Sequence, residues 1–117
     1  MADEREALLP GTIELLVLKT LSLERLHGYA IVREIQRKSA EVLVIEEGSL
    51  YPALHRMERR GWIDAEWGAS ESNRRAKYYS LTKSGRAELK ARSASWQRFS
   101  DAIAQVLEPR SPAAEAR

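Results

Sequence analysis

The fold is decided by one stretch of the chain, residues 48–63, which reads GSLYPALHRMERRGWI. Leu50, Leu54 and Met57 are spaced i, i+4 and i+7, so a helix would place all three on one side, facing a core. The other side carries ring and cationic side chains, namely Tyr51, Pro52, His55, Arg56 and Arg59. One apolar face and one aromatic, cationic face are typical of a helix that lies in a groove.

Both ends of this helix have signals in the sequence. Ser49 can cap the start with its hydroxyl, and Gly61 can end the helix in a left-handed turn. Pro52 then falls in the first turn, where its missing N–H has no helical partner to lose. Because the residue before a proline resists helical geometry, the start is expected at Ser49 or as late as Tyr51.

Composition excludes several classes of protein. The chain has 117 residues, of which 44% are hydrophobic and 31% charged, and this suits one domain with a real core. It has no cysteine and only two histidines, so we expect no disulfide, no metal site and no cofactor. No apolar run approaches the roughly 20 residues that cross a bilayer, and the acidic start is unlike a signal peptide. We therefore expect a cytoplasmic protein.

No catalytic set stands out, so we do not expect an enzyme. The sequence has no cysteine nucleophile, no glycine-rich phosphate loop and no metal-ligand spacing. Glu46 and Glu47 are adjacent carboxylates, but they are expected only to favour the dipole at the start of the helix. His27 is interpreted as a helix-start residue.

Positive charge is concentrated in the second half of the chain. Residues 1–47 carry 6 Lys/Arg and 9 Asp/Glu, a net −3, whereas residues 48–98 carry 11 and 5, a net +6. Residues 99–117 return to a net −1. This uneven distribution of charge indicates that one part of the fold binds a polyanion. About half of these cations, roughly those after Lys83, can instead be explained as the solvated side chains of an exposed helix.

Two helices and a connector are predicted before residue 48. Residues 12–21 are apolar on more than one face, so this first helix should be buried on two sides. Residues 22–26 form a turn, and His27 opens a second helix with an inward stripe of Ile31, Val32 and Ile35. Residues 41–45 are short and β-branched, which suits either an extended connector or a minor strand.

After Gly61 the apolar period changes from about 3.6 to about 2, which predicts a β-hairpin over residues 63–67 and 76–81. Trp62 and Trp67 are interpreted as strand residues that cover the core or its rim. A long helix starts near Thr82 and Ser84, with Gly85 as a mild weak point. The tail has two prolines and no core residue.

This order of elements predicts a mainly α fold with a small β-hairpin: a winged helix-turn-helix plus a C-terminal dimerisation helix. Residues 1–9 are assigned to a flexible N-terminal segment and residues 10–82 to a winged-helix DNA-binding domain. Residues 83–107 form the dimerisation helix, and residues 108–117 a disordered tail.

The helix at 48–63 would enter the major groove, where arginine can bond guanine with two hydrogen bonds. Arg56 and Arg59 are the stronger candidates, while His55 could equally be a solvated residue. The hairpin tip would follow phosphates or reach the minor groove with Asn73, Arg74, Arg75 and Lys77.

The last helix carries a seam of apolar side chains. Leu89, Trp96 and Ile103 are spaced by seven residues, and Phe99 and Val106 fill the alternate positions. Arg92 interrupts the seam. The helix is expected to pair with a second copy, and the alternative is that it packs on its own domain.

These segments together resemble a PadR-type transcriptional regulator of the short kind, over nearly all of residues 11–107. The resemblance is carried by Gly11–Leu18, His27-Gly28-Tyr29, Glu47–Leu54, Arg60–Ile63 and Arg75–Thr82. It implies a homodimeric winged-helix repressor whose first and last helices make the dimer. Only one helix is predicted after the wing, so we expect no separate multi-helix C-terminal dimerisation domain of the kind that larger members have.

The resemblance also assigns roles to particular residues. Tyr29, Ser49 and Tyr51 would lie near the DNA backbone, and Arg74, Arg75 and Lys77 match the wing. The expected dimer contacts are Leu15, Leu18, Leu89, Trp96, Phe99, Ile103 and Val106. In multidrug-sensing members paired tryptophans hold a flat aromatic compound, so Trp96 is a candidate effector-binding residue; the alternative is an interface anchor.

We therefore expect a sequence-specific DNA-binding regulator, a repressor that acts as a homodimer on an inverted repeat with half-sites about 34 Å apart. The partners are double-stranded DNA, a second copy and a small planar aromatic effector, with no membrane. An alternative is a winged-helix protein-interaction module without specific DNA binding. RNA binding is disfavoured because no cluster of exposed aromatics lies on a predicted sheet.

Overall fold

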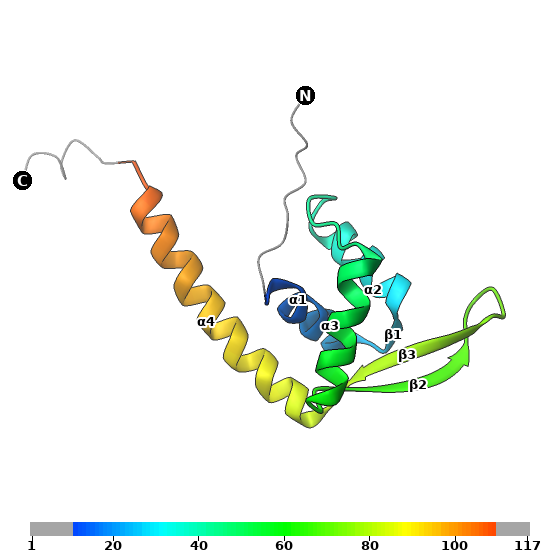
Figure 1. Cartoon of the computed structure of the whole chain (residues 1–117). Helices are drawn as coiled ribbons and strands as arrows, with labels where there is room; N and C mark the ends of the chain where they lie inside the picture. Colours follow the sequence, from blue (N-terminus) through cyan, green and yellow to red (C-terminus); the bar gives the residue numbers. More distant parts are fainter. Residues whose placement is uncertain (1–10, 110–117) are drawn as a thin grey trace, which may run out of the picture.

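The computed structural model describes residues 11–109 and contains four α-helices and a small antiparallel sheet in that range (Figure 1). Its elements are α1 (Thr12–Leu23), β1 (Leu26–His27), α2 (Gly28–Lys38), α3 (Glu47–Arg59), β2 (Ile63–Ala69), β3 (Arg75–Leu81) and α4 (Lys83–Leu107). The strand order is β1-β3-β2. The prediction of a mainly α winged helix is confirmed. The expectations for residues 1–9 and for the tail from residue 110 onward lie outside the described residues.

The core lies where α1, α2 and α3 meet the base of the sheet. The apolar side of α3 is buried as its spacing predicts, with Leu50, Leu54 and Met57 at most 1% exposed. The other buried apolar residues are Val17, Leu18, Leu21, Ile31, Ile35, Ile45, Ala53, Ile63 and Tyr79. This core fixes the direction of α3, because four of its side chains, from Leu50 to Met57, are buried in it.

Helix α3 starts earlier than its sequence suggests. The N-cap is Glu46, and its carbonyl accepts the N–H groups of Ser49 and Leu50 at 2.9 and 3.0 Å. The expectation that Ser49 caps the helix is therefore wrong, and Pro52 lies inside the helix. A proline at this depth leaves the carbonyl four residues earlier, at Gly48, without its usual helical donor.

The C-terminal end of α3 is as predicted. Gly61 has a φ of 79°, and its N–H donates to the carbonyl of Glu58 at 3.0 Å. The N–H of Trp62 reaches back to the carbonyl of Met57, also at 3.0 Å. These two bonds form a Schellman motif, which turns the chain directly into β2.

Two predictions about the connectors are corrected or resolved. Leu26 and His27 form a short strand paired with Tyr79 and Tyr78 of β3, which the turn expected over residues 22–26 did not include, while His27 also stands at the start of α2 as predicted. Pairing with residues about fifty positions away decides this, and local periodicity carries no trace of it. Residues 42–46 are a connector without regular secondary structure, so the minor strand considered for that stretch does not form.

Helix α4 begins against the core and then leaves it (Figure 1). At its start, Gly85 is buried so close to the backbone of Trp62 that a Cβ would lie 2.1 Å from the Trp62 carbonyl oxygen. The predicted weak point is thus a position that only glycine can fill. Toward its C-terminus the helix extends away from the other elements, which gives the described chain extents of 65 × 38 × 21 Å.

Candidate nucleic-acid interface

The solvent side of α3 presents a crest of four exposed residues, Gly48, Pro52, His55 and Arg59. Their spacing of i, i+4, i+7 and i+11 places them on one line, opposite the buried stripe. Ser49 lies beside the crest and is also exposed. The crest has the smallest side chain at the start of the helix and the longest cation at its end.

Two other candidates on α3 lie on the flanks of the crest and point to different neighbours. Tyr51 leans toward the start of α2, where a Cβ on Gly28 would be 2.7 Å from the Tyr51 hydroxyl oxygen. Arg56 turns the opposite way, and its Nε donates to Oε1 of Glu14 in α1 at 3.3 Å. Arg56 is therefore held beside α1 and not on the crest.

The β2–β3 hairpin is a wing whose two faces are set by its register. Trp67 pairs with Lys77, and Ala65 with Tyr79, so these side chains share one face with Arg75. That face is joined to α3, because Nζ of Lys77 lies 3.5 Å from a carboxylate oxygen of Glu58. The guanidinium of Arg75 lies over the Trp67 ring at 4.5 Å.

The wing tip is held by backbone bonds around Ser70. Its N–H donates to the carbonyl of Arg74 at 2.7 Å, and its carbonyl accepts the N–H of Asn73 at 2.9 Å. Asn73 has a φ of 61°, a conformation that asparagine tolerates better than most residues. Asn73 thus helps to form the turn at the wing tip, whereas the side chain of Arg74 is exposed there.

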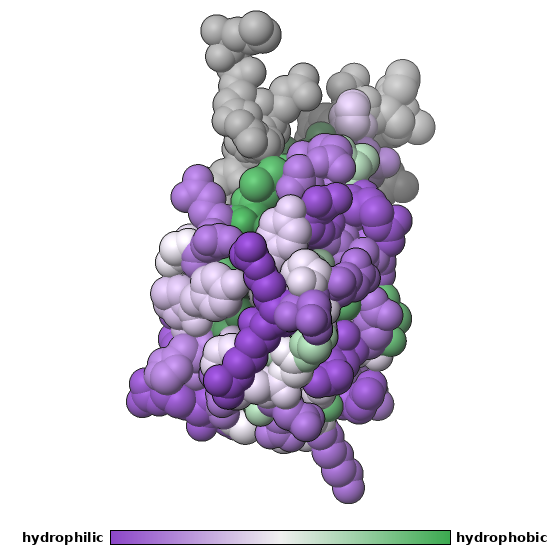
Figure 2. All heavy atoms as spheres, turned by 90° about the vertical axis from the view of Figure 1, so that its right-hand side faces the viewer, coloured by the Kyte–Doolittle hydropathy of each residue, from purple (hydrophilic) through white to green (hydrophobic). Residues whose placement is uncertain are grey.

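The opposite face of the wing carries Tyr78, whose ring contacts side chains from β1 and the residue before it. The guanidinium of Arg25 lies 4.3 Å from the Tyr78 ring, and His27 meets the same ring edge-on at 5.4 Å. His27 also caps α2, because its Nδ1 accepts the N–H of Ala30 at 3.2 Å. The interpretation of His27 as a helix-start residue agrees with this geometry. Seen from the wing end, the molecule is largely hydrophilic (Figure 2).

An open groove of about 520 Å³ runs between α2, α3 and the wing. It is lined by His27, Gly28, Tyr29, Tyr51, Trp67, Arg75, Ala76, Lys77 and Tyr79. Burial, followed by the nearby Glu58 and Tyr51, raises the pKa of Tyr79. Tyr29 accepts a hydrogen bond from Arg33 at 3.1 Å, which raises the pKa of that exposed guanidinium. Aromatic and cationic side chains from β1, α2, α3 and both strands of the wing meet in this groove.

Trp67 in the groove and Glu14 on the other flank of α3 were not among the residues predicted for a functional site. Trp67 was interpreted as covering the core or its rim, but it is 55% exposed and lines the groove. Trp62 lies just before β2, not in a strand. Only the pairing register with β3 could have shown which way Trp67 faces. Glu14 lies in the first turn of α1, and no spacing in the sequence connects it to Arg56 or Arg92.

The residues expected at a dimer interface divide into two groups. Leu18 is wholly buried within its own chain and so presents no surface to a second copy, whereas Leu89 is partly buried against the core and its interface assignment stays a prediction. Trp96, Phe99, Ile103 and Val106 are exposed along α4. Leu15 lies between the groups, lining a cleft of about 360 Å³ with Gly11, Thr12, Arg92, Ser95, Trp96 and Phe99.

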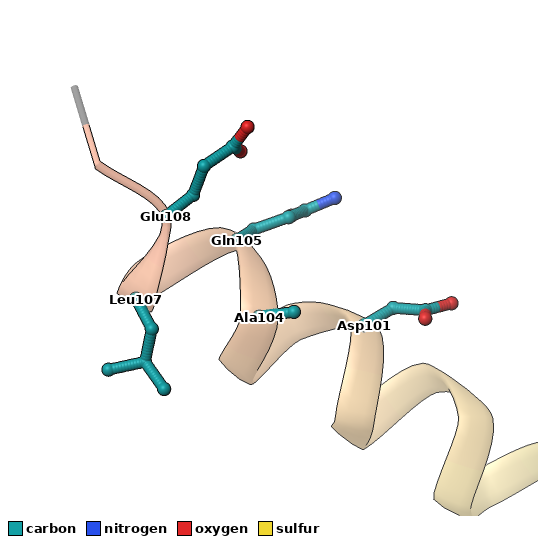
Figure 3. A pocket seen from close by; sticks show the side chains of 5 residues that line it. All are labelled: Asp101, Ala104, Gln105, Leu107 and Glu108. Atoms are coloured by element: carbon teal, nitrogen blue, oxygen red, sulfur yellow. The ribbon is translucent and has the colours of Figure 1, made fainter. Parts of the chain in front are cut away.

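A hollow at the end of α4 offers no enclosed site. Its lining consists of Asp101, Ala104, Gln105, Leu107 and Glu108, all from the last turns of the helix and its C-cap. In Figure 3 these side chains splay apart, with Leu107 pointing away from Asp101, Gln105 and Glu108. Within residues 11–109 no group of three or more His, Cys, Asp or Glu could hold a metal ion. None of the helices described is long and apolar enough to span a membrane.

Comparison with known proteins gives consistent results. Residues 17–91 match the model of a family described as "Transcriptional regulator PadR-like family". A transcriptional regulator from Clostridium thermocellum is 30% identical with a TM-score of 0.76, over 84% of this chain and 95% of that one. A PadR-family regulator from Eggerthella lenta is 33% identical with a TM-score of 0.72, over 86% and 85%. An uncharacterised protein of Lysinibacillus sphaericus is 26% identical over 104 residues, 89% of this chain and 95% of the relative.

Proposed function

Because the chain belongs to the PadR-like family of transcriptional regulators, and is thus a DNA-binding regulator and not an enzyme, we propose that it is a repressor. In this proposal it binds an inverted-repeat operator as a homodimer. The observation that carries the proposal is the Lys77–Glu58 ion pair, which joins a cationic wing to the helix that carries the crest. One rigid surface can then reach bases and backbone together.

In the proposed complex α3 lies in the major groove with its crest toward the bases. Arg59 and His55 reach base edges, and Pro52 contacts an apolar edge such as a thymine methyl. Tyr29, Ser49 and Tyr51 contact the sugar-phosphate backbone, as the resemblance implied. Arg74, Arg75 and Lys77 follow the neighbouring backbone from the wing.

The proposed dimer is supported by the exposed apolar seam of α4. Trp96, Phe99, Ile103 and Val106 lie on one side of a helix that leaves the core, which is costly for a monomer in water. A second copy that pairs through the same seam would bury them around a twofold axis. Two recognition helices would then face half-sites one helical turn apart.

An effector is proposed for the cleft beside Trp96. The cleft joins the indole to Leu15 and Phe99, and such a lining suits a small planar aromatic compound. The competing role for Trp96 is that of an interface anchor. Fluorescence titration with planar aromatic compounds, in the presence and absence of operator DNA, separates the two roles when the wild type is compared with Trp96→Phe, since the chain has two other tryptophans.

The experiment that tests the main proposal selects bound fragments from a random duplex pool and inspects them for dyad symmetry. Sedimentation velocity of the same sample gives the state of assembly. Ile103→Asp should shift it to monomer and abolish binding to the full inverted repeat, whereas Ala94→Asp, on the opposite side of α4, should not. A monomeric wild type, or weak DNA binding with little salt dependence, would favour the protein-interaction module instead.

A further inference from the structure

The side chain of Glu14 is a buried carboxylate that arginines from two other helices share. It is 8% exposed, in a helix whose neighbouring residues are mostly apolar. Its Oε1 accepts from Nε of Arg56 in α3 at 3.3 Å, and its Oε2 accepts from Nη1 of Arg92 in α4 at 3.1 Å. Nη1 of Arg60, at the C-cap of α3, lies 3.7 Å from the same Oε2. One carboxylate thus connects α1 to both the recognition helix and the proposed dimerisation helix.

The arginine of α4 is fixed more firmly than those of α3. Nε of Arg92 also donates to Glu88 one turn earlier at 2.7 Å, and its side chain is 28% exposed. Its guanidinium lies 4.8 Å from the Trp62 ring, and that of Arg60 lies 5.1 Å from the same ring. Arg56, by contrast, has a half-exposed side chain and one carboxylate oxygen as its partner in the described residues.

Arg56 is therefore the member of the cluster that can leave most easily. It follows His55 directly on α3, so its stem starts beside the crest that the proposed function turns toward the bases. A phosphate and the Glu14 carboxylate offer a guanidinium the same kind of charge-assisted bond, and they compete for it. Whether Arg56 joins the DNA contact depends on how firmly Glu14 holds it.

We propose that Glu14 is a positioning residue for DNA recognition: it keeps Arg56 against α1 and away from the nucleic acid, and Arg92 makes that hold depend on the placement of α4. This inference rests on the proposed function and deepens it. A shift in the position of α4 would then reach the recognition surface through two hydrogen bonds, from Arg92 and Arg56 to the Glu14 carboxylate. No element would have to refold.

The first experiment measures the salt dependence of duplex binding for Glu14→Gln, Arg56→Ala and the double variant. Glutamine keeps the shape of the side chain and removes its charge, so Arg56 should move to a phosphate and steepen the log–log slope by about one unit. The specific-to-nonspecific ratio should fall at the same time, because a phosphate contact carries no sequence information. In the Arg56→Ala background, Glu14→Gln should leave the slope unchanged.

Glu47→Gln is the matched control. It removes one carboxylate from the exposed first turn of α3 and so raises the local potential without touching the Glu14 cluster. Any effect of Glu47→Gln should persist in the Arg56→Ala background. An effect of Glu14→Gln that also persists there would mean that general electrostatics explains it, and the inference would fail.

The second experiment needs no DNA. Exchange of the Arg56 Nε–H with solvent, followed by NMR in the free protein, should accelerate several-fold in Glu14→Gln. Arg92→Ala should also accelerate it, because the carboxylate loses the donor that fixes its orientation, whereas Lys90→Ala on the exposed side of α4 should not. Equal exchange in wild type and Glu14→Gln would overturn the inference. If the wild type binds duplex DNA but Glu14→Gln leaves the slope unchanged, the inference about Glu14 fails and the proposed function stands. A wild type that binds no duplex would refute the proposed function itself.

Discussion

Tyr51 and Gly28 are in contact across the junction of α3 and α2: a Cβ at position 28 would lie 2.7 Å from the Tyr51 hydroxyl oxygen and 3.0 Å from two ring carbons. The absence of a side chain at position 28 therefore sets where the phenol of Tyr51 lies. That phenol lines the groove beside Tyr29 and the wing.

Gly28→Ala should displace Tyr51 and weaken DNA binding with little loss of stability. The clashing atoms belong to the far end of a partly exposed side chain, so the free energy of unfolding should fall by no more than about 1 kcal/mol. Fluorescence anisotropy with an operator duplex measures the affinity, and urea unfolding measures the stability. Tyr51→Phe is the control, because it removes the hydroxyl without displacing the ring. A Gly28→Ala variant that binds as tightly as wild type would exclude a role for the Tyr51 position.

Gly85→Ala should be strongly destabilising. The added Cβ meets the carbonyl oxygen of Trp62 at 2.1 Å, and backbone cannot move aside cheaply. We expect a loss of at least about 1–3 kcal/mol, the usual effect of overpacking, seen as a lower Tm in thermal unfolding. Gly48→Ala is the matched control, because its Cβ would meet open space in the first turn of α3. Equal Tm values for the two variants would contradict the packing of α4 on Trp62.

Arg74→Ala combined with Lys77→Ala should flatten the salt dependence of DNA binding. Each lost phosphate contact reduces the log–log slope by about 0.9 for a duplex. Arg74 should contribute one whole phosphate contact. Lys77 is paired with Glu58, so the substitution of Lys77 also leaves the Glu58 carboxylate unpaired near the DNA. The slope is measured by anisotropy across a salt series. An unchanged slope would count against the wing as a DNA contact.

Arg59→Ala should relax sequence preference more than Arg56→Ala does. Arg59 lies on the exposed crest, whereas Arg56 is bonded to Glu14. Loss of one bidentate base contact reduces discrimination by about 1–3 kcal/mol at the base pair concerned. Competition between operator variants that differ at single positions measures this. Uniform weakening on all sequences would make Arg59 a backbone contact.

Tyr79→Phe should reduce the loss of stability at alkaline pH. Burial is the main cause that raises the pKa of Tyr79 above the ordinary value of about 10. Above that pH the unfolded chain loses this proton first and binds fewer protons than the native state, so the free energy of unfolding falls as pH rises. Urea unfolding between pH 9 and 11 should show a shallower fall in Tyr79→Phe. Identical pH profiles would show that Tyr79 does not contribute.

The sequence by itself determined the features that local spacing encodes. The two faces of α3 follow from the positions of Leu50, Leu54 and Met57, and the end of the helix follows from Gly61. The change of period after Gly61 gave the wing, and the apolar residues of α4 gave its seam. Each depends on residues within a few turns of one another, where helix and strand geometry alone fix which side chains share a face.

Only the tertiary structure decided which of those faces meet. Glu14 lies 42 residues from Arg56 and 78 from Arg92, and β1 pairs with a strand about fifty residues away. The burial of Leu18 and Leu89, the exposure of Trp67 and the close approach at Gly85 are set in the same way. Contacts between distant segments depend on how whole elements pack around one core, and a period of 2 or 3.6 residues carries no information about that packing.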